Sequence, residues 1–311
     1  MTDSDNLAAT WSRYWDSGQT ESSSGELVSL APIASAWRAF FSRLPNGARL
    51  LDLATGGGHV LRLAIDAAAE LGRTFDLSGT DLADLSAVAA RFPAQVKLTG
   101  KADVARLPFA DGEFDSVVSQ FGIEYADSVR AYPEAVRVLA SDGRGQFILH
   151  HQQGEIVSAA RARLAAYRAL FPDDAAFRDA QEVFERIAGG DDRSAIVAAI
   201  LRFRRTVAAL AARLRGAPAW QDLGQIAGLL QNLARQPESH VAEDALRRIT
   251  SLWDEVKGWQ LRQRAVVEAA LSREGAERVG AILNRAGAKT IAVEEVRSDS
   301  TAIAWCCTFR K

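Results

Sequence analysis

The sequence predicts an α/β protein with a doubly wound, mostly parallel sheet, and three observations support this fold class. Short β-rich runs alternate with helical patterns from about Arg49 to Gln153, which is typical of β-α-β units. The chain then stays helical over residues 154–271. The final segment, 272–311, returns to one helix and two strands. Together these segments predict a seven-stranded sheet with a large helical insertion after the fifth strand.

The alternating region contains five expected strands with helices between them. The strands are RLLDLA (49–54), FDLSGTD (75–81), QVKLTG (95–100), FDSVVSQF (114–121) and GQFILHH (145–151). Apolar residues recur at helical spacing in the stretches 59–71, 82–92 and 128–140. Three of the four connections contain a helical pattern, and such crossovers join parallel strands.

The C-terminal segment predicts an antiparallel hairpin. A helix over 275–287 precedes the strands KTIAVEEV (289–296) and TAIAWCCTFR (301–310), which are separated only by RSDS. So short a connection can join two strands only in antiparallel fashion, because a parallel crossover needs a dozen or more residues.

The sequence divides into an N-terminal helical segment, a core and an insertion. The segment 1–45 carries the aromatic patterns WSRYW and AWRAFFSRL, the core comprises 46–153 and 272–311, and the insertion comprises 154–271. Within the insertion, one apolar stripe follows helical spacing through Ile196, Ile200, Phe203, Val207, Leu210 and Leu214. Packing inside a helical bundle is the favoured interpretation of this stripe, and a substrate-facing surface is the alternative. The insertion is expected to act as a lid or as a partner surface.

Composition argues against several functional classes. The 311 residues are 48% hydrophobic with a formal net charge of −2, so no overall positive field attracts nucleic acid or an anionic membrane. The cluster RFRR at 202–205 is interpreted as a solvated helix face, with an anion or nucleic-acid contact as the alternative. Cys306 and Cys307 are adjacent and cannot staple a fold. We expect no metal site, no membrane span and a cytoplasmic location.

A glycine turn in LLDLATGGGHVLRLA (50–64) connects the first strand to a helix. Such a turn offers backbone N–H groups and the positive end of a helix dipole to a ligand. The dinucleotide pattern G-x-G-x-x-G, counted from Gly56, requires a glycine where Leu61 stands. Asp81 follows the second strand 25 positions after Gly56, where a carboxylate can accept hydrogen bonds from ribose hydroxyls. The alternative role of Asp81 is a helix N-cap, for which Asp84 and Ser86 compete.

The motifs LLDLATGGG, GTD, ADVARLPFADGEFDSVVSQFGI and EAVRVLASDGRGQFIL occur in this order. Their combination resembles the class I S-adenosylmethionine-dependent methyltransferases, which have a Rossmann-like sheet, and within them the ubiquinone/menaquinone C-methyltransferase branch. The resemblance covers 49–151 and the C-terminal hairpin. It implies S-adenosylmethionine as cofactor and a binding site formed by Asp52, Ala54, Gly56, Gly57, Gly58, Asp81, Leu82, Asp103, Val104 and Gln120.

The resemblance also implies a role for each part of this site. The glycine turn would hold the methionine end, Asp81 the ribose, Asp103 and Val104 the adenine, and Gln120 would lie near the sulfonium. Two departures are visible in this chain. Ala54 replaces the commoner first glycine, and the insertion over 154–271 is foreign to the quinone enzymes. The second departure favours an acceptor other than a quinone.

Candidate catalytic residues lie where the fourth and fifth strands end. Methyl transfer from a sulfonium needs a base only if the nucleophile must lose a proton. His150, His151, Glu124 and Tyr125 occupy these carboxyl ends, where open α/β sheets bind ligands. Strand alternation points the two histidines to opposite faces, so we expect at most one to face the pocket. Additional candidates are His59, beside the glycine turn, and the aromatic residues of WSRYW, which could cover the cofactor or pack in the core.

The sequence therefore predicts a methyltransferase acting on a small molecule, with O, N, C or S as the acceptor atom. One alternative is a quinone-type C-methyltransferase. Another is a non-catalytic cofactor-binding protein that forms a homodimer through the insertion. An NAD-dependent oxidoreductase is disfavoured by Leu61 and by the antiparallel final hairpin.

Overall fold

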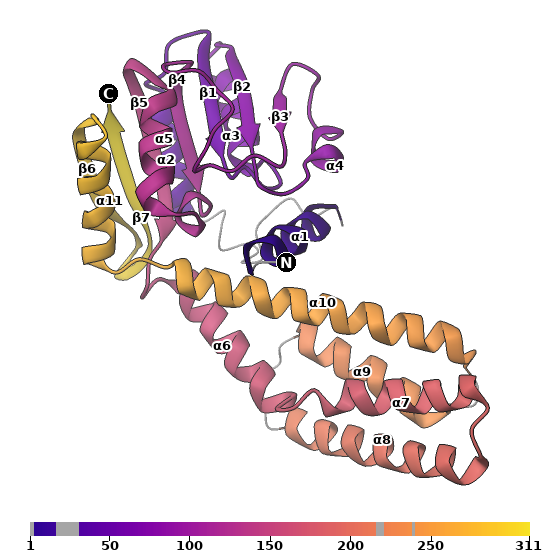
Figure 1. Cartoon of the computed structure of the whole chain (residues 1–311). Coiled ribbons are helices and arrows are strands. Elements are labelled where there is room, and N and C mark those ends of the chain that lie inside the picture. Colours follow the sequence, from indigo (N-terminus) through magenta and orange to yellow (C-terminus); the bar gives the residue numbers. More distant parts are fainter. Residues whose placement is uncertain (1–2, 17–30, 216–220, 238–239) are drawn as a thin grey trace. The chain divides into compact units, whose positions relative to one another are not determined.

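A seven-stranded sheet forms the centre of the chain, in the order β3-β2-β1-β4-β5-β7-β6 (Figure 1). The computed structural model describes residues 3–16, 31–215, 221–237 and 240–311. Adjacent strands from β3 through β5 run parallel, and β7 runs antiparallel to both β5 and β6. The predicted fold class and hairpin are therefore confirmed. The strands are β1 (Ala48–Leu53), β2 (Phe75–Thr80), β3 (Lys97–Thr99), β4 (Phe114–Gln120), β5 (Leu139–His150), β6 (Lys289–Ser298) and β7 (Thr301–Arg310).

Two layers of helices cover the sheet. On one face, α2 (Ala31–Phe41) and α3 (His59–Glu70) pack against the strands through a core that includes Trp37 and Phe41. On the other face, α5 (Ser128–Val138) and α11 (Arg273–Arg285) enclose a second core around Tyr132. These apolar layers bury both faces of the parallel strands, which explains why β1 reads as a continuous apolar run interrupted only by Arg49 and Asp52.

Two elements differ from the sequence expectation in extent. The helix expected over 82–92 is reduced to α4 (Ser86–Ala89), because the side chains of Asp81 and Asp84 accept the backbone N–H groups of Ala83 and Ser86 in place of helical carbonyls. Strand β5 begins at Leu139, six residues before the expected start at Gly145, since Leu139 pairs with Phe114 of β4. The remaining short elements of this part of the chain are α1 (Asp3–Asp16) and η2 (Ile123–Tyr125).

The chain divides into two compact units, 1–160 with 264–311 and 161–263. The polypeptide passes between them within the helices α6 (Glu155–Leu170) and α10 (Ala242–Ala269). The other helices of the second unit are α7 (Ala175–Gly189), α8 (Arg193–Leu214) and α9 (Gln221–Arg235). The expected role of this unit as a lid or partner surface stays a prediction.

The apolar stripe on α8 forms part of the core of the second unit. Ile200, Phe203, Val207 and Leu210 are buried there together with apolar side chains of α7 and α9. The basic cluster on the same helix is held by neighbours within the unit. Arg202 pairs with Glu182, and the Arg204 guanidinium donates to the carbonyl oxygens of the last two residues of α9. Among the described helices, none is both long and apolar enough to cross a membrane.

Truncating Phe203 should destabilise the second unit. Its side chain is fully buried, so Phe203→Ala should lower the free energy of unfolding by about 3–5 kcal/mol through lost apolar contact and a cavity. Leu201→Ala on the same helix is the control, since Leu201 is 53% exposed and should change this free energy by less than about 0.5 kcal/mol. Hydrogen exchange of the α8 amides measures both effects. Equal protection in the two variants would contradict the packing described here.

Candidate functional site

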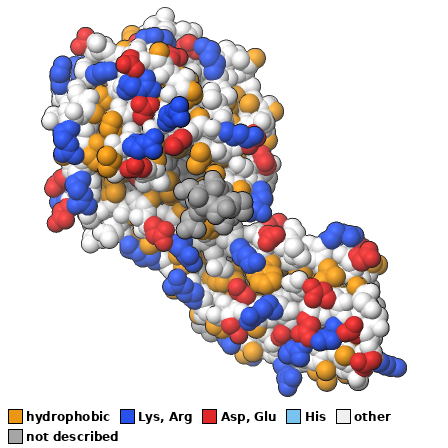
Figure 2. All heavy atoms as spheres, viewed as in Figure 1, with side chains coloured by type: hydrophobic (Ala, Val, Ile, Leu, Met, Phe, Trp, Pro, Cys, Tyr) orange, Lys and Arg blue, Asp and Glu red, His pale blue; other side chains and the backbone are white. Residues whose placement is uncertain are grey.

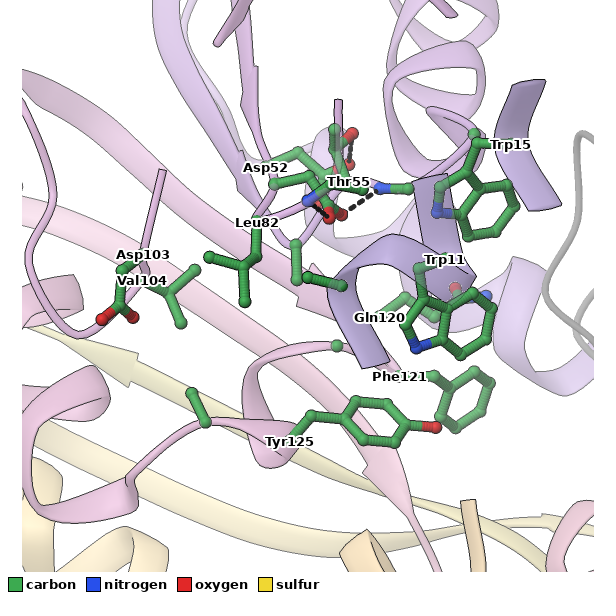
Figure 3. Close-up of a pocket in the computed structure, with 18 of the residues that line it drawn as sticks. Trp11, Trp15, Asp52, Thr55, Leu82, Asp103, Val104, Gln120, Phe121 and Tyr125 are labelled. Carbon is green, nitrogen blue, oxygen red and sulfur yellow. Dashed lines mark hydrogen bonds between the residues drawn. The ribbon is translucent and has the colours of Figure 1, made fainter. Parts of the chain in front are cut away.

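A cavity of about 520 Å³ opens at the carboxyl edge of the parallel strands (Figure 3). All its lining residues belong to the first unit. Most of them come from α1, the glycine turn after β1, the loops after β2 and β3, and the ends of β4 and β5, and α3, η2, α5 and α10 supply the others. The strand order reverses between β1 and β4, and ligands of open α/β sheets bind at such a reversal. The volume is in the range of small-molecule sites.

The glycine turn contacts the aromatic residues of α1 closely. Gly56 has a φ of +51°, and a Cβ built there would lie 2.5 Å from a ring carbon of Trp15. Gly58 has a φ of +80°, and a Cβ there would lie 2.3 Å from Phe92. Ala54 adopts a φ of +51° as well, a conformation that is costly for a residue with a side chain. The turn therefore needs glycine for both backbone angle and space, and Ala54 is strained in its position.

Asp52 carries a buried carboxylate at this turn. Its Oδ2 accepts a 2.6 Å hydrogen bond from the Thr55 hydroxyl, while Oδ1 is buried with no hydrogen-bond partner among the residues the structure describes. Burial raises the pKa of Asp52 to about 7, with a smaller contribution from the charge of Asp81. A cationic group placed beside Oδ1 would relieve this unfavourable burial.

Asp81 connects the loop after β2 to the glycine turn. One carboxylate oxygen accepts the Gly56 N–H at 2.8 Å, and the other accepts the Ala83 N–H at 2.8 Å. Each oxygen keeps a further lone pair for a ligand hydroxyl. Burial raises the pKa of Asp81, opposed by these backbone hydrogen bonds. Leu82, the next residue, is 48% exposed and lines the same cavity.

Asp103 and Val104 line the end of the cavity that follows β3. Figure 3 shows them on the opposite side of Leu82 from Trp11 and Gln120. Asp103 accepts the backbone N–H of Ala105 at 2.8 Å, which shapes the loop. This end combines a carboxylate with apolar surface, as a flat heterocycle with exocyclic N–H groups would require.

The end of β4 supplies the next wall. Gln120 lines the cavity, and its Oε1 accepts a 2.5 Å hydrogen bond from the indole N–H of Trp37. Phe121 follows with a φ of +53°, and its backbone N–H donates to the carbonyl of Ile148 on β5. A left-handed backbone conformation is strained for phenylalanine, and strain of this kind is found at functional sites.

Glu124 and His150 form a buried pair beside this wall. Glu124 Oε1 accepts the backbone N–H of His150 at 3.0 Å and lies 2.8 Å from its ring Nδ1. Their side chains are only 1% and 2% exposed, yet His150 lines the cavity. The aromatic rings of Phe121 and Tyr125 flank the imidazole at centroid distances of 4.4 and 5.8 Å.

His151 takes a different position from His150. Its ring lies 4.6 Å from that of Trp305, and its Nε2 is 3.9 Å from Glu295 of β6. Its Nδ1 accepts the backbone N–H of Gln153, and burial lowers its pKa. The structure thus brings His150, Glu124 and Tyr125 together and places His151 elsewhere, as the alternation of side chains along a strand requires.

Other candidates from the sequence also surround the cavity. Trp11 and Trp15 of α1 line it, as does His59, the first residue of α3. Trp11 lies 5.5 Å from Trp15 and 6.4 Å from Tyr125 between ring centroids. Tyr14 packs edge-on against both tryptophans. The aromatic residues of α1 therefore serve as core and as cavity wall at once.

Sequence reasoning missed several residues that line the site, among them Thr55, Phe121 and Val266. Phe121 and Val266 line the cavity, and Thr55 both lines it and holds Asp52. Thr55 directly follows the first predicted strand and Phe121 is the last residue of the fourth, which was a usable signal. Val266 lies in α10, far along the chain, and nothing local in the sequence indicates its contribution. Among the described residues, no cluster of three His, Cys, Asp or Glu side chains could hold a metal ion.

Comparison with known protein families gives a direct match over the region that builds this cavity. Residues 51–147 match the family described as a methyltransferase domain. The chain contains a class I S-adenosylmethionine-dependent methyltransferase domain. The matched range begins within β1 and ends within β5, so this methyltransferase domain includes the glycine turn, Asp81, Asp103 and Gln120.

Two named relatives each match only part of this chain. The ubiquinone/menaquinone biosynthesis C-methyltransferase UbiE of Geotalea uraniireducens is 33% identical over 150 residues, covering 43% of this chain and 57% of the relative. A demethylmenaquinone methyltransferase of Thermus thermophilus is 37% identical over 101 residues, covering 31% of this chain and 44% of the relative. The chain thus spans about half the length of these relatives.

Solved structures include an S-adenosylmethionine-dependent methyltransferase from Aquifex aeolicus. It aligns with a TM-score of 0.43 at 12% identity, covering 92% of this chain and 90% of that protein.

The residues of the methyltransferase domain fit S-adenosylmethionine. The unpartnered Oδ1 of Asp52 suits the cationic amino group of the methionine end. Asp81 keeps lone pairs for the ribose hydroxyls, and the loop at Asp103 and Val104 suits the adenine. The backbone of the glycine turn lines the cavity without a side chain at Gly56. A Cβ at that position would collide with the ring of Trp15.

Asp52 should make the stability of the methyltransferase domain depend on pH. Its pKa is about 7 in the folded state against an ordinary 3.8, so the folded chain binds more protons than the unfolded chain between about pH 4 and pH 7. The free energy of unfolding should therefore fall as pH rises through this window, by up to about 4 kcal/mol from this group. Asp52→Asn should remove that part of the slope.

Differential scanning calorimetry across this pH range tests the prediction. Asp76→Asn is the control, because Asp76 lies near the start of β2, does not line the cavity and forms an exposed ion pair with Lys97 on β3. The control should keep the slope of the wild-type chain. An Asp52→Asn profile parallel to that of the wild type would show that Asp52 is ionised in the folded protein at all these pH values.

Proposed function

We propose that this protein transfers a methyl group from S-adenosylmethionine to a small organic acceptor, in the cytoplasm. One observation carries the proposal: a single cavity joins the glycine turn and Asp81 to a histidine backed by a buried carboxylate. The first group suits a nucleoside carrying a cationic methionine, and the second suits an acceptor that must lose a proton. The free, adjacent Cys306 and Cys307 are consistent with a reducing compartment.

The chain's own residues bind and orient the reactants in this proposal. Bound S-adenosylmethionine supplies a methyl group on a sulfonium, which a nucleophile displaces in line. Asp81 accepts the ribose hydroxyls, Asp103 and Val104 hold the adenine, and the turn at Gly56 allows close approach of the methionine end. Trp11 and Trp15 exclude water from the cavity. Positioning of the acceptor in line with the methyl group supplies most of the acceleration.

A small molecule is the favoured acceptor because of the cavity's size and walls. The volume of about 520 Å³ suits an enclosed ligand, and Trp11, Phe121 and Tyr125 give part of it an aromatic lining. On the face shown in Figure 2, Lys and Arg side chains are interspersed with Asp and Glu over each unit. Such mixing gives no single-sign surface of the kind that a nucleic acid backbone would favour.

A ring carbon is the second candidate acceptor. The relatives from Geotalea uraniireducens and Thermus thermophilus are named as quinone-pathway methyltransferases, the first of them a C-methyltransferase. Those matches cover only 43% and 31% of this chain. More than half of this chain therefore lies outside each of these matches, and a quinone acceptor stays the second candidate.

Calorimetric titration with S-adenosylmethionine tests the cofactor assignment. The wild-type chain should bind it, and Asp81→Ala should weaken binding by at least about tenfold, because two charge-assisted hydrogen bonds to the ribose are lost. Asp76→Ala is the matched control, since Asp76 lies on β2, the strand that leads to Asp81, is held in an exposed ion pair and does not line the cavity. Absent binding by the wild type, or equal affinity in all three proteins, would refute the proposal.

A further inference from the structure

The buried pair of Glu124 and His150 has an unusual hydrogen-bond arrangement. Glu124 Oε1 takes both the backbone N–H and the ring Nδ1 of His150, whereas Oε2 is buried with no hydrogen-bond partner among the residues the structure describes. A carboxylate buried in this way is costly unless a positive charge lies beside it. Nδ1 of His150 lies 2.8 Å from Glu124 Oε1. This contact fixes the orientation of the imidazole at the cavity wall.

The ring of His150 is held with one nitrogen available for a ligand. When Nδ1–H donates to Glu124, the lone pair of the neutral imidazole is on Nε2. Because Glu124 occupies the Nδ1 side, Nε2 is the nitrogen that can serve the cavity that His150 lines. The ring of Phe121, at 4.4 Å, packs beside the imidazole and restricts its orientation. In this arrangement a carboxylate orients an imidazole whose other nitrogen can accept a proton from the acceptor, as in a general base.

Neighbouring groups are poorly suited to this role. The pKa of Tyr125 is raised well above its ordinary value, first by burial and then by the charge of Glu124, so its phenol stays protonated at neutral pH. Asp103 lies in the loop after β3, at the far end from Trp11 (Figure 3). Asp52 lies at the glycine turn and accepts from Thr55. Asp127 also lines the cavity, but it caps α5 by accepting the Val129 N–H, and His59 lies beside the glycine turn at the start of α3. His150 is thus the lining group placed to take a proton at the aromatic end.

The walls around His150 suit a flat ring. Trp11, Phe121 and Tyr125 all line the cavity, with Tyr125 5.8 Å from the His150 ring and 6.4 Å from Trp11. Aromatic pairs prefer edge-on or offset contacts at such separations. The strained φ of +53° at Phe121 is held by its N–H bond to the Ile148 carbonyl. A planar acceptor could stack against these rings with its polar edge toward His150.

We propose that the acceptor is a phenol-class hydroxyl on an aromatic ring, that His150 removes its proton, and that Glu124 positions His150. This inference rests on the proposed function. The hydroxyl O–H bond breaks and its proton goes to Nε2 of His150. The phenolate oxygen bonds to the methyl carbon as the S–CH3 bond breaks, and the electron pair of that bond stays on sulfur. The products are a methyl ether and a neutral thioether, and His150 returns its proton to solvent.

One base at this position matches oxygen as the acceptor atom. Transfer to oxygen requires the loss of a single proton, which His150 accepts. Transfer to a ring carbon also releases one proton net, but that proton leaves the carbon after the methyl group has arrived. The identity of the methylated product therefore decides between oxygen and carbon.

The ionisation of a bound chromophoric phenol tests the inference without turnover. Para-nitrophenol, buffered below its own pKa, is added to the full chain in the presence of S-adenosylhomocysteine. The wild type should convert the bound probe to the phenolate, seen as its visible absorption band. His150→Gln and Glu124→Gln should bind the probe as the neutral phenol. A probe that does not bind, or a phenolate band of equal intensity in wild type and His150→Gln, would overturn the assignment.

Two controls and a replacement variant complete this test. Calorimetry should show that each variant binds S-adenosylhomocysteine with the affinity of the wild type. If the wild type itself does not bind it, the proposed function fails. If the wild type binds it but shows no phenolate band, only the present inference is refuted. His151→Gln separates the adjacent histidines, and loss of the band equal to that in His150→Gln contradicts the choice of His150. If His150→Gln does not fold, His150→Asn, which retains a donor near the Nδ1 position, replaces it.

Turnover then distinguishes oxygen from carbon. With S-adenosylmethionine, para-nitrophenol should become para-nitroanisole, which lacks the phenolate band, and His150→Gln should slow this reaction by about 100-fold or more. Glu124→Gln should lower kcat with little change in KM for the phenol, since it acts through His150. A product methylated on the ring keeps the band and would overturn the choice of oxygen.

Discussion

The reversal of strand order between β1 and β4 is the constraint on which the rest of the structure depends. Strand β1 pairs with β2 on one side and with β4 on the other, all parallel, so the loops that leave their carboxyl ends diverge to opposite sides and open a crevice. The hydrogen bond from the Gly56 N–H to Asp81 closes one side of this crevice. The parallel pairing of β1 with both β2 and β4 thus brings the glycine turn, Asp81 and Gln120 to one site.

Parallel pairing of β4 with β5 likewise positions the pair of Glu124 and His150. Gln120 of β4 lies opposite Ile148 of β5 in parallel register, so Glu124, just beyond the end of β4, lies beside His150, the last residue of β5. Their 2.8 Å contact joins a residue of η2 to the last residue of β5. A methyltransferase domain that depends mainly on positioning can gain a proton acceptor in this way without altering its cofactor site.

Most of the fold could be predicted because periodicity and connection length are local properties. The alternation of β-rich and helical runs indicated the parallel strands, and the four residues RSDS allowed only an antiparallel hairpin. Local signals were weaker where side chains compete with the backbone. Asp81 and Asp84 shortened the helix expected over 82–92, and the start of β5 at Leu139 depends on a partner strand that the local sequence does not reveal.

The sequence by itself determined the chemical types in the site: a glycine turn without the dinucleotide glycine, an acidic residue after β2, and polar residues after β4 and β5. These follow from residue identity and spacing along single elements. Only the tertiary structure decided which histidine faces the cavity, that Glu124 holds it, and that Thr55, Phe121 and Val266 complete the walls. Those facts depend on strand register and on contacts between segments far apart in the chain, which no local pattern encodes.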